Sequence, residues 1–460
     1  MSDTSSLPKI TIVGCGPAGS LLATLLGKKG YAVTVFEKRP DMRKHDISAG
    51  RSINLALANR GIKPLKAAGV MDTVEKILIT MEGRMIHPVE GELQLQKYGQ
   101  QAHEVIYSVS RGDLNSILMD AAEENTNVDL IFEADIDEVD LEQQVIRYNL
   151  DGEQKQHHFE ILIGADGAGS VVRNAIDATT NNDADSIYHL KQLGHSYKEL
   201  NIPSITKSGE TEFAMVPHAL HIWPRGEFMM IALPNEDKSF TVTLFLPNEG
   251  ANSFATLKDQ QQLESFFSEK FPDVKAMIPD LYKDFFDNPT GHLATVFCDK
   301  WDYKEHTVLL GDAAHAVVPF HGQGMNCAFE DCLELVEQLK QNEHNWSLTI
   351  QQFQSIRKPN SDAIATMAIE NYVEMRASVS DKKYLLNKEL AFKLEQSFPD
   401  YLIPRYAMVM FHHMPYSEAF KRGKIQQQLL DSLTEDCNDI SQVDLKLAAK
   451  LVLQRLDKIS

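Results

Sequence analysis

The sequence predicts an α/β fold that combines a Rossmann-like dinucleotide-binding domain with a parallel sheet, an antiparallel-sheet domain and a C-terminal helical region. Three observations predict it: a strand-turn-helix-strand pattern at residues 9–37, period-two apolar segments between about 189 and 297, and helical periodicity beyond roughly 345. A chain of 460 residues is also too long for one compact core. We expect the dinucleotide-binding domain at 8–180 and 295–375 (with 71–101 contributing to the substrate side), the antiparallel domain at 181–294 and the helical cap at 376–460.

The first pattern is a β-α-β unit built around the turn Gly14-Cys15-Gly16-Pro17-Ala18-Gly19. An apolar run at 9–13 predicts a buried strand, and the turn leads into an apolar helix at 20–28. Glycines at this spacing make a tight turn and let a pyrophosphate approach the amino end of the helix. Glu37 ends the second strand, where a carboxylate accepts hydrogen bonds from ribose hydroxyls. This context predicts a dinucleotide site.

Two later strand-to-helix turns each carry an aspartate among glycines. The apolar run 159–163 leads into Gly164-Ala165-Asp166-Gly167, and the run 308–310 leads into Gly311-Asp312. Both runs are typical of buried parallel strands, whose carboxyl ends bind ligands in open α/β sheets. Further glycines at 322 and 324 allow close backbone approach before another helix. Two interpretations of Asp166 and Asp312 stay open, ligand contact and capping of the following helix.

The middle of the chain alternates apolar and polar residues and then becomes helical. Strands are predicted at 219–223, 228–233 and 240–246, with a helix over 266–287. From about 345 the pattern is helical to the end, with breaks at two prolines, Pro399 and Pro404. The amphipathic stretch 392–414 is interpreted as a cap on a pocket, because a membrane-surface helix would carry a dense basic face.

Composition excludes several classes of partner. The 45 basic and 65 acidic residues give a formal charge of -20, which argues against nucleic acid or an anionic membrane surface. Five cysteines, an odd number without metal-ligand or disulfide spacing, predict reduced thiols, a cytoplasmic location and no metal site. The polar start lacks the features of a signal peptide, and no apolar run approaches the roughly 18 residues of a membrane helix.

The order and spacing of the three glycine motifs resemble the single-component flavoprotein aromatic hydroxylases, the para-hydroxybenzoate hydroxylase superfamily. The resemblance implies bound FAD, with the first motif on its ADP half, the middle motif near the pyrophosphate and the late Gly-Asp pair on the ribityl chain. The cofactor contacts it implies are Gly14, Gly16, Ala18, Gly19, Glu37, Lys38, Arg39, Leu57, Arg111, Ile136, Asp166, Gly311, Asp312, Gly324, Met325 and Asn326.

Within that family, further segments resemble the members that hydroxylate L-kynurenine. The segments are 50–61, 83–87, 220–224, 319–327, 370–375 and 404–406, so the resemblance covers nearly the whole chain. It implies that NADPH docks transiently and reduces the flavin, and that O2 then forms a C4a-hydroperoxide. That species would hydroxylate kynurenine beside its aniline nitrogen, giving 3-hydroxykynurenine. The polar end of this chain differs from the hydrophobic anchor of eukaryotic members and is similar to soluble bacterial ones.

The resemblance also implies a substrate site. Arg84 and Tyr98 hold the substrate carboxylate, which suits a cation with fork geometry, and Asn371 and Tyr406 complete the polar contacts. The aromatic end is lined by Leu220, Ile222, Met229, Ile231, Leu233, Phe245 and Phe320. Read without the family, Arg84 could be a surface ion-pair residue and the apolar set simply the buried face of a sheet. His321 is either a substrate contact or a structural histidine, and the pattern gives no reason to call it a general base.

Two alternatives to this function stay open: a related flavin hydroxylase acting on another amino-bearing aromatic acid, and a flavin-binding redox sensor. Products from a panel of aromatic acids would separate the first, and redox-dependent association would identify the second. The sequence does not decide between NADPH and NADH, nor does it give the oligomeric state, for which a homodimer is one alternative.

Overall fold

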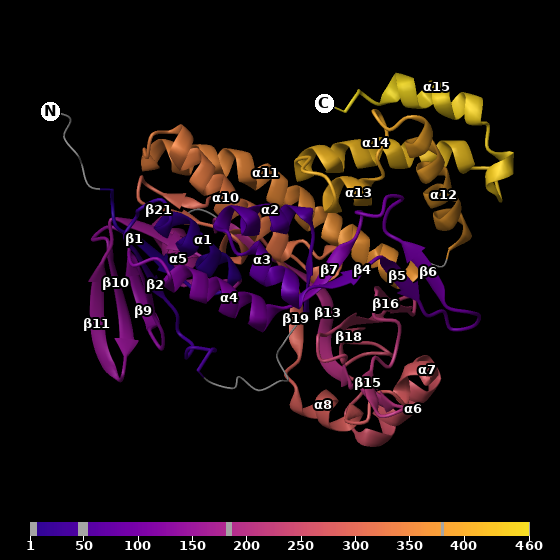
Figure 1. Ribbon diagram of the computed structural model, residues 1–460, viewed down its shortest axis with the longest axis horizontal. Coiled ribbons are helices and arrows are strands. Elements are labelled where there is room, and N and C mark those ends of the chain that lie inside the picture. Colours follow the sequence, from indigo (N-terminus) through magenta and orange to yellow (C-terminus); the bar gives the residue numbers. More distant parts are fainter. Residues whose placement is uncertain (1–6, 45–53, 181–185, 379–380, 460) are drawn as a thin grey trace. The chain divides into compact units, whose positions relative to one another are not determined.

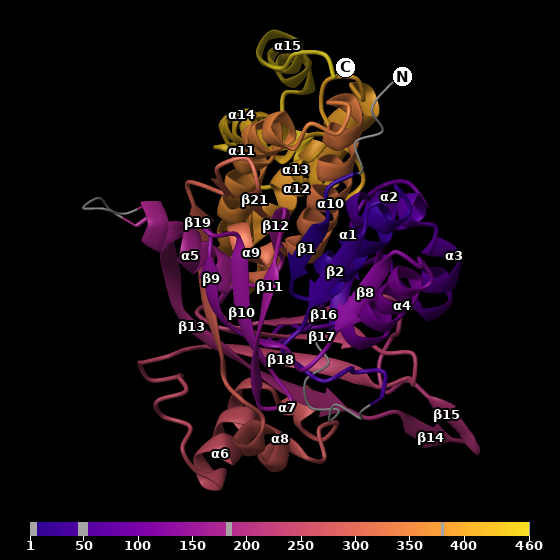
Figure 2. The same ribbon diagram turned by 90° about the vertical axis from the view of Figure 1, so that its left-hand side faces the viewer.

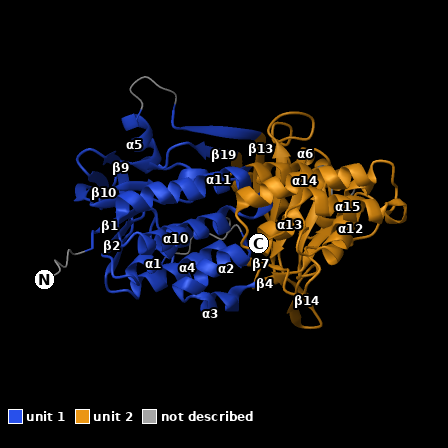
Figure 3. Ribbon diagram, turned by 90° about the horizontal axis from the view of Figure 1, so that it is seen from above, with its two compact units in different colours: residues 1–78, 109–193, 294–365 blue, residues 79–108, 194–293, 366–460 orange. Residues whose placement is uncertain are grey.

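The computed structural model describes residues 7–44, 54–180, 186–378 and 381–459 (Figure 1). These residues form two compact units, each assembled from three stretches of chain (Figure 3). Unit 1 comprises 1–78, 109–193 and 294–365, and unit 2 comprises 79–108, 194–293 and 366–460. The helices after residue 366 therefore group with the predicted antiparallel sheet, in which one strand pair, 83–86 with 219–222, is parallel.

Unit 1 contains the expected parallel sheet. Its six strands lie in the order β20 (Asp302–Tyr303), β21 (Thr307–Leu309), β12 (Ile161–Gly164), β1 (Ile10–Val13), β2 (Val33–Phe36) and β8 (Val128–Ile131). All neighbours are parallel except β20 and β21. Every residue of β1 is buried, as expected for a strand covered on both faces. The strand order places the carboxyl ends of β1, β12 and β21 side by side.

Helices of unit 1 follow directly from these strands. Helix α1 (Pro17–Gly27) packs against α4 (Arg111–Glu123) and α10 (Gly324–Gln341), and α10 also packs against α2 (Asn59–Ala68). The remaining elements of this part of the chain are β3 (Asn54–Leu57), α3 (Met71–Val74), η2 (Glu75–Ile77), α5 (Val171–Thr180), α9 (Asp312–His315), η3 (Pro319–His321) and the start of α11 (Trp346–Val373).

A small antiparallel sheet in unit 1 was not predicted. It consists of β9 (Asp135–Asp140), β10 (Val145–Leu150) and β11 (Glu153–His158), which stand together as a separate blade (Figure 2). The blade packs on β2 through rings, since the centroids of Phe36 and Tyr148 lie 4.9 Å apart. The outer strands β9 and β11 are mostly polar and lack the apolar alternation that predicts a strand, whereas β10 shows it at Ile146, Tyr148 and Leu150.

Unit 2 is built on a seven-stranded sheet. The order is β19 (Gly291–Cys298), β13 (Tyr188–Ile202), β18 (Phe240–Pro247), β17 (Met229–Pro234), β16 (Ala219–Pro224), β5 (Gly83–Ile86) and β6 (Gln94–Lys97). The predicted strands at 219–223, 228–233 and 240–246 are thus confirmed as β16, β17 and β18. In addition, β4 (Ile79–Met81) pairs with β7 (Ile106–Ser110) as part of a separate three-stranded sheet, and β14 (Ile205–Lys207) forms a two-stranded sheet with β15 (Glu210–Glu212).

One face of this sheet packs on helices. Trp223, Met230 and Leu244 share a core cluster with Phe267 and Leu281 of the helices that follow β18. The single helix predicted over 266–287 is wrong, because Phe271 leaves helical geometry and Pro272 starts a new helix. The structure has three helices instead: α6 (Gln260–Lys270), α7 (Pro272–Lys275) and α8 (Leu281–Asp287).

The C-terminal part of unit 2 is helical, as predicted. Its elements are the π-helical turn η4 (Glu374–Ser378), α12 (Lys382–Ser397), α13 (Arg405–Met410), α14 (Tyr416–Thr434), η5 (Ile440–Gln442) and α15 (Leu445–Arg455). Apolar residues of α12, α14 and α15 form one core cluster. None of the helices in the described part of the chain combines the length and the hydropathy that crossing a bilayer requires.

Candidate cofactor and substrate sites

The first glycine turn is shaped by the protein's own packing at two of its three glycines. Gly14 has a φ of +101°, and a Cβ there would lie 2.5 Å from the Ala165 carbonyl oxygen. At Gly19 an added Cβ would lie 1.9 Å from the Gly14 oxygen, whereas at Gly16 it would meet nothing within 4 Å. Helix α1 begins here without a side-chain cap, so its first N–H groups and the open space at Gly16 are available to an anion.

Glu37 lies beside this turn and is buried. Its carboxylate accepts a hydrogen bond from the Cys15 N–H at 2.9 Å and pairs with Arg39 at 2.7 Å. Burial acts to raise the pKa of Glu37, but the hydrogen bonds and charge of Arg39 outweigh it and hold the pKa below its ordinary value. The ionised carboxylate therefore offers acceptors where the sequence predicts a ribose. Lys38 is exposed next to it, and Ile136 lies on β9 of the same unit.

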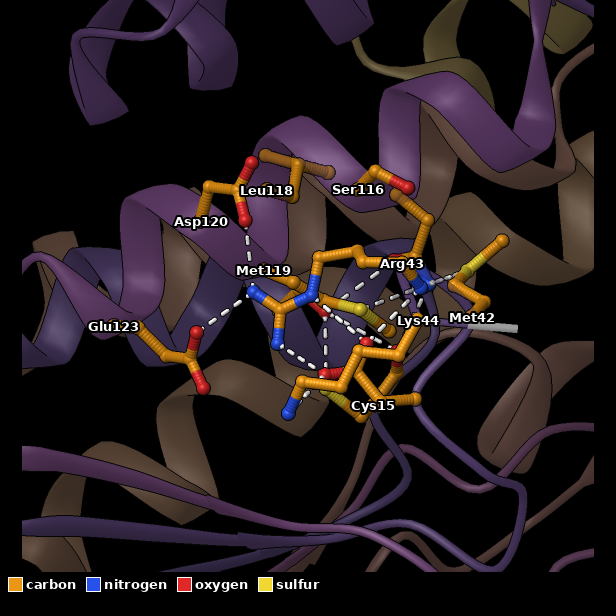
Figure 4. Close-up of polar contacts among 12 residues, drawn as sticks. Cys15, Met42, Arg43, Lys44, Ser116, Leu118, Met119, Asp120 and Glu123 are labelled. Atoms are coloured by element: carbon orange, nitrogen blue, oxygen red, sulfur yellow. Dashed lines mark hydrogen bonds and ion pairs between the residues drawn. The ribbon is translucent and has the colours of Figure 1, made fainter. Parts of the chain in front are cut away.

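Arg43, for which the sequence predicts no role, holds the segment after Glu37 against α4 through ion pairs. Arg43 pairs with Asp41 at 2.9 Å, and on α4 with Asp120 at 2.8 Å and Glu123 at 2.7 Å (Figure 4). The Arg43 hydrogen bonds lower the pKa of Asp41 to about 2. Asp120 lies 77 residues from Arg43 along the chain, so no local sequence motif indicates this ionic cluster.

The two aspartates with alternative interpretations behave differently. The Asp166 carboxylate accepts hydrogen bonds from the Ser170 hydroxyl at 2.6 Å and the Val171 N–H at 2.7 Å, so it caps α5. Burial raises its pKa above the ordinary value. Asp312, in contrast, is exposed at the start of α9, and within the described part of the chain this helix has no side-chain cap. The capping interpretation thus describes Asp166, and the Asp312 carboxylate stays available for the predicted ribityl contact.

Gly311, before Asp312, is held by a buried ionic network. Its φ is +59° and its N–H donates to Asp331 at 3.0 Å. Asp331 is fully buried and also binds His315 at 2.5 Å and Arg357 at 2.6 Å. Burial acts to raise the pKa of Asp331, but His315 and Arg357 hold it below the ordinary value. His315, Cys327 and Asp331 have atoms close enough to hold a metal ion, but Arg357 already supplies the positive charge, so we assign no metal.

Asn326 fastens the glycine-rich segment from the side of α10. Its Oδ1 accepts from the Ala58 N–H at 2.9 Å, and its Nδ2 donates to the carbonyls of Ala56 at 2.8 Å and Gly322 at 2.7 Å. The Asn326 side chain is therefore used by the protein, and only its backbone could meet a cofactor. Helix α10 starts at Gly324 without a side-chain cap, which leaves N–H groups for a ligand.

The remaining predicted cofactor residues also fall in unit 1. Leu57 is fully buried at the end of β3, and Arg111 opens α4 with an exposed side chain. Ala18 and Met325 lie in the first turns of α1 and α10. The uncapped helix starts, the open position at Gly16 and the ionised Glu37 fit a flavin dinucleotide. Residues 50–53 of the segment at 50–61 lie outside the described residues.

Unit 2 brings the four predicted polar substrate residues together. Arg84 on β5 is 5% exposed, and its Nη2 donates to Asn371 Oδ1 at 3.4 Å. Its guanidinium lies 4.9 Å from the ring centroid of Tyr406, which stacks on Tyr98 with 5.3 Å between centroids. The Arg84 Nη1 donates to Glu374 at 3.3 Å. The alternative of a surface ion pair for Arg84 is wrong, since the side chain is buried.

Burial sets the charges of this cluster. It raises the pKa of the Tyr406 phenol to about 12 and that of Tyr98 well above its ordinary value, so both stay neutral donors. Burial alone would lower the pKa of Arg84, but the surrounding phenols and Glu374 keep it raised, and the residue is a permanent cation. Lys388, a second cation, has its pKa lowered to about 8 by burial and by Arg84. The cluster therefore favours a carboxylate ligand.

The predicted apolar wall shares one face of the sheet with Arg84. Leu220 pairs with Arg84 across β16 and β5, and Ile222 pairs with Ile231 across β16 and β17. Because side chains alternate between faces, the register puts the following residues on the Arg84 face, opposite the one that packs on α6 to α8: Leu220, Ile222, Met229, Ile231, Leu233 and Phe245. Their contact with substrate stays a prediction. Phe320 and His321 are buried on η3, and their predicted roles also stay predictions.

Comparisons with known proteins show which family the chain is similar to. Residues 8–366 match the FAD binding domain family. The chain is 44% identical to a kynurenine 3-monooxygenase of Myxococcus xanthus over 97% of this chain and 95% of the relative, and 45% identical to one of Stenotrophomonas maltophilia over 95% and 94%. The structure of PqsL of P. aeruginosa in complex with 2-aminobenzoylacetate superposes with a TM-score of 0.64 at 20% identity, covering 80% of this chain and 96% of PqsL. That likeness concerns the fold alone.

Proposed function

The chain belongs to the kynurenine 3-monooxygenase family of FAD-dependent monooxygenases, and we propose that it converts L-kynurenine to 3-hydroxykynurenine with NADPH and O2. The observation that carries the substrate assignment is the buried cluster of Arg84, Asn371, Tyr98 and Tyr406 beside an apolar sheet face. A substrate with a carboxylate at one end and an aromatic ring at the other matches both parts. The family assignment supplies the reaction type, because no side chain provides an electrophilic oxygen.

FAD would be held by unit 1. The starts of α1 and α10 present uncapped N–H groups, Glu37 offers an ionised carboxylate, and Asp312 is exposed for a polar contact. When bound and reduced by NADPH, the flavin supplies the activated oxygen for hydroxylation. The protein's part is to bind, orient and shield the reactants.

Arg84 would fix the orientation of the substrate. A guanidinium binds a carboxylate through two parallel hydrogen bonds, which sets both the position and the direction of the molecule. The neutral phenols of Tyr98 and Tyr406 add donors. The apolar wall then takes the ring and excludes water from the reacting carbon. No protein acid or base is assigned to the aromatic ring, because its aniline amine already activates the neighbouring carbon.

The test is identification of the product. Purified holoenzyme is incubated with L-kynurenine, NADPH and O2, and the product is analysed by mass spectrometry with a 3-hydroxykynurenine standard. NADPH consumption alone is insufficient, since an effector can stimulate flavin reduction and release peroxide. Formation of 3-hydroxykynurenine supports the proposal. A protein that binds FAD but hydroxylates only other amino-bearing aromatic acids in a panel would contradict it.

A further inference from the structure

The polar cluster around Arg84 contains a carboxylate that recognition of a substrate carboxylate does not require. Glu374 begins η4, directly after α11. Its Oε1 accepts hydrogen bonds from the Tyr384 hydroxyl at 2.8 Å and from Arg84 Nη1 at 3.3 Å. An anion beside the arginine competes with an incoming carboxylate, so its presence calls for a role of its own.

Arg84 and Glu374 each keep one polar atom unused. The Arg84 Nε is buried and makes no hydrogen bond to the described residues. On Glu374 the hydrogen bonds to Tyr384 and Arg84 both involve Oε1, and Oε2 has no partner in the described part of the chain. A donor on a cation and an acceptor on an anion thus remain within one cluster. An α-amino acid carries the complementary pair, a carboxylate and an ammonium joined through a single carbon.

We propose that Glu374, positioned by Tyr384, binds the α-ammonium of the substrate and makes the site select amino acids over simple carboxylic acids. This inference rests on the proposed function and extends it to a residue and a substrate group. The ammonium would donate to Glu374 Oε2 while the α-carboxylate binds Arg84.

Tyr384 makes Glu374 a defined acceptor. Burial and the charge of Glu374 raise the pKa of the Tyr384 phenol, so the phenol stays protonated and donates. Its hydrogen bond fixes Oε1 and leaves Oε2 for the ligand. Tyr384 does not touch the ligand in this arrangement and is a positioning residue.

The selection follows from the cost of leaving the charge of Glu374, whose side chain is only 26% exposed, without its partner. A carboxylate that binds Arg84 without bringing an ammonium weakens the Arg84 contact with Glu374 and leaves that carboxylate poorly compensated. Lys388 lowers this cost in part, since it carries positive charge in the same cluster. An amino acid avoids this cost, because its ammonium pairs with Glu374 in place of the Arg84 guanidinium.

The experiment compares two substrates in the holoenzyme. The first is L-kynurenine, and the second is 4-(2-aminophenyl)-4-oxobutanoate, which lacks only the α-amino group. Values of kcat/KM are measured from hydroxylated product for the wild type, Glu374→Gln and Tyr384→Phe. Glu389→Gln is the matched control, since Glu389 is an exposed residue of α12.

For Glu374→Gln we expect kcat/KM for L-kynurenine to fall about 10- to 150-fold, the range for a hydrogen bond to a charged group. The value for the analogue should stay the same or rise, because the substitution removes the charge that the analogue leaves uncompensated, and the FAD content should be unchanged. Tyr384→Phe should shift the ratio of the two values in the same direction by a smaller factor, and Glu389→Gln should leave it unchanged.

Equal losses for both substrates in Glu374→Gln would overturn the inference and make Glu374 a structural partner of Arg84. If Glu374→Gln fails to fold, an unchanged ratio in Tyr384→Phe overturns it instead. Failure of the wild type to hydroxylate either compound would contradict the proposed function itself, which is a separate result.

Discussion

The substitution Asp331→Asn tests whether the buried ionic network holds the Gly311 turn in place. Asparagine keeps the size of the side chain and one oxygen that can accept the Gly311 N–H, so the change removes mainly charge. Arg357 then loses its partner at 2.6 Å and keeps the longer contact to Glu330 at 3.3 Å. The backbone at Gly311, whose φ is +59°, loses the charged acceptor that opposes its relaxation.

The expected loss is large because both partners are buried. Breaking a buried pair by removing one partner costs about 3–5 kcal/mol, and the remaining contact of Arg357 with Glu330 places the loss toward the lower end of that range. In a folding unit of about 150–250 residues each kcal/mol lowers the Tm by about 2–4 °C, so the Tm of unit 1 should fall by about 6–20 °C. FAD affinity should fall as well, since the Gly311 turn precedes Asp312.

The assay is thermal unfolding of the apoprotein by circular dichroism, with FAD binding followed by quenching of flavin fluorescence. Glu337→Gln is the control, because it removes one carboxylate from an exposed position of the same helix α10. A Tm for Asp331→Asn within about 2 °C of this control, together with unchanged FAD affinity, would refute the reasoning.

Three further predictions concern single residues. Gly16→Ala should leave the apoprotein Tm unchanged, because a Cβ there meets only open space, but should weaken FAD binding. Gly14→Ala should both lower the Tm and weaken FAD binding. Equal Tm losses in the two variants would contradict this prediction. His87 donates to Asp273 at 3.1 Å and helps keep the pKa of Asp273 below its ordinary value. The contribution of the ionised Asp273 to stability is present above the ordinary aspartate pKa and is lost as the pH falls through the lowered pKa of the folded protein. The difference in Tm between wild type and Asp273→Asn should therefore shrink below about pH 4. A Tm difference that stays constant from about pH 7 to 3 would contradict this prediction. Burial raises the pKa of the Cys15 thiol to about 12, so a disulfide reagent at pH 8 should not modify it in the folded protein, as mass spectrometry of digests can check.

What the sequence predicts well is local in the chain. The strands on either side of the first glycine turn, and the alternation that puts Ile222 and Ile231 on one sheet face, follow from apolar periodicity within a few residues. The network of Asp331 and Arg357 joins residues 26 positions apart, and Arg43 reaches a carboxylate 77 positions away. Such pairs depend on how helices pack and leave no periodic signal.

The substrate cluster shows the same limit. Arg84 was identified through resemblance to a family, while the residue types alone favoured a surface ion pair. Glu374 lies 290 positions from Arg84; the resemblance covers its segment, 370–375, but assigns a substrate contact there only to Asn371, because the pattern does not show that Glu374 contacts Arg84. Its significance comes only from the buried cation that it contacts.

The first glycine turn has a consequence for how such motifs are used to detect cofactor sites. Of its three glycines, Gly14 and Gly19 are excluded from carrying side chains by neighbouring backbone, and only Gly16 borders empty space. A chain that kept this fold but no longer bound a dinucleotide would still need the outer two and could replace the middle one. The middle position is therefore the diagnostic one, and its occupation by a larger residue in another chain would indicate loss of the ligand while the fold persists.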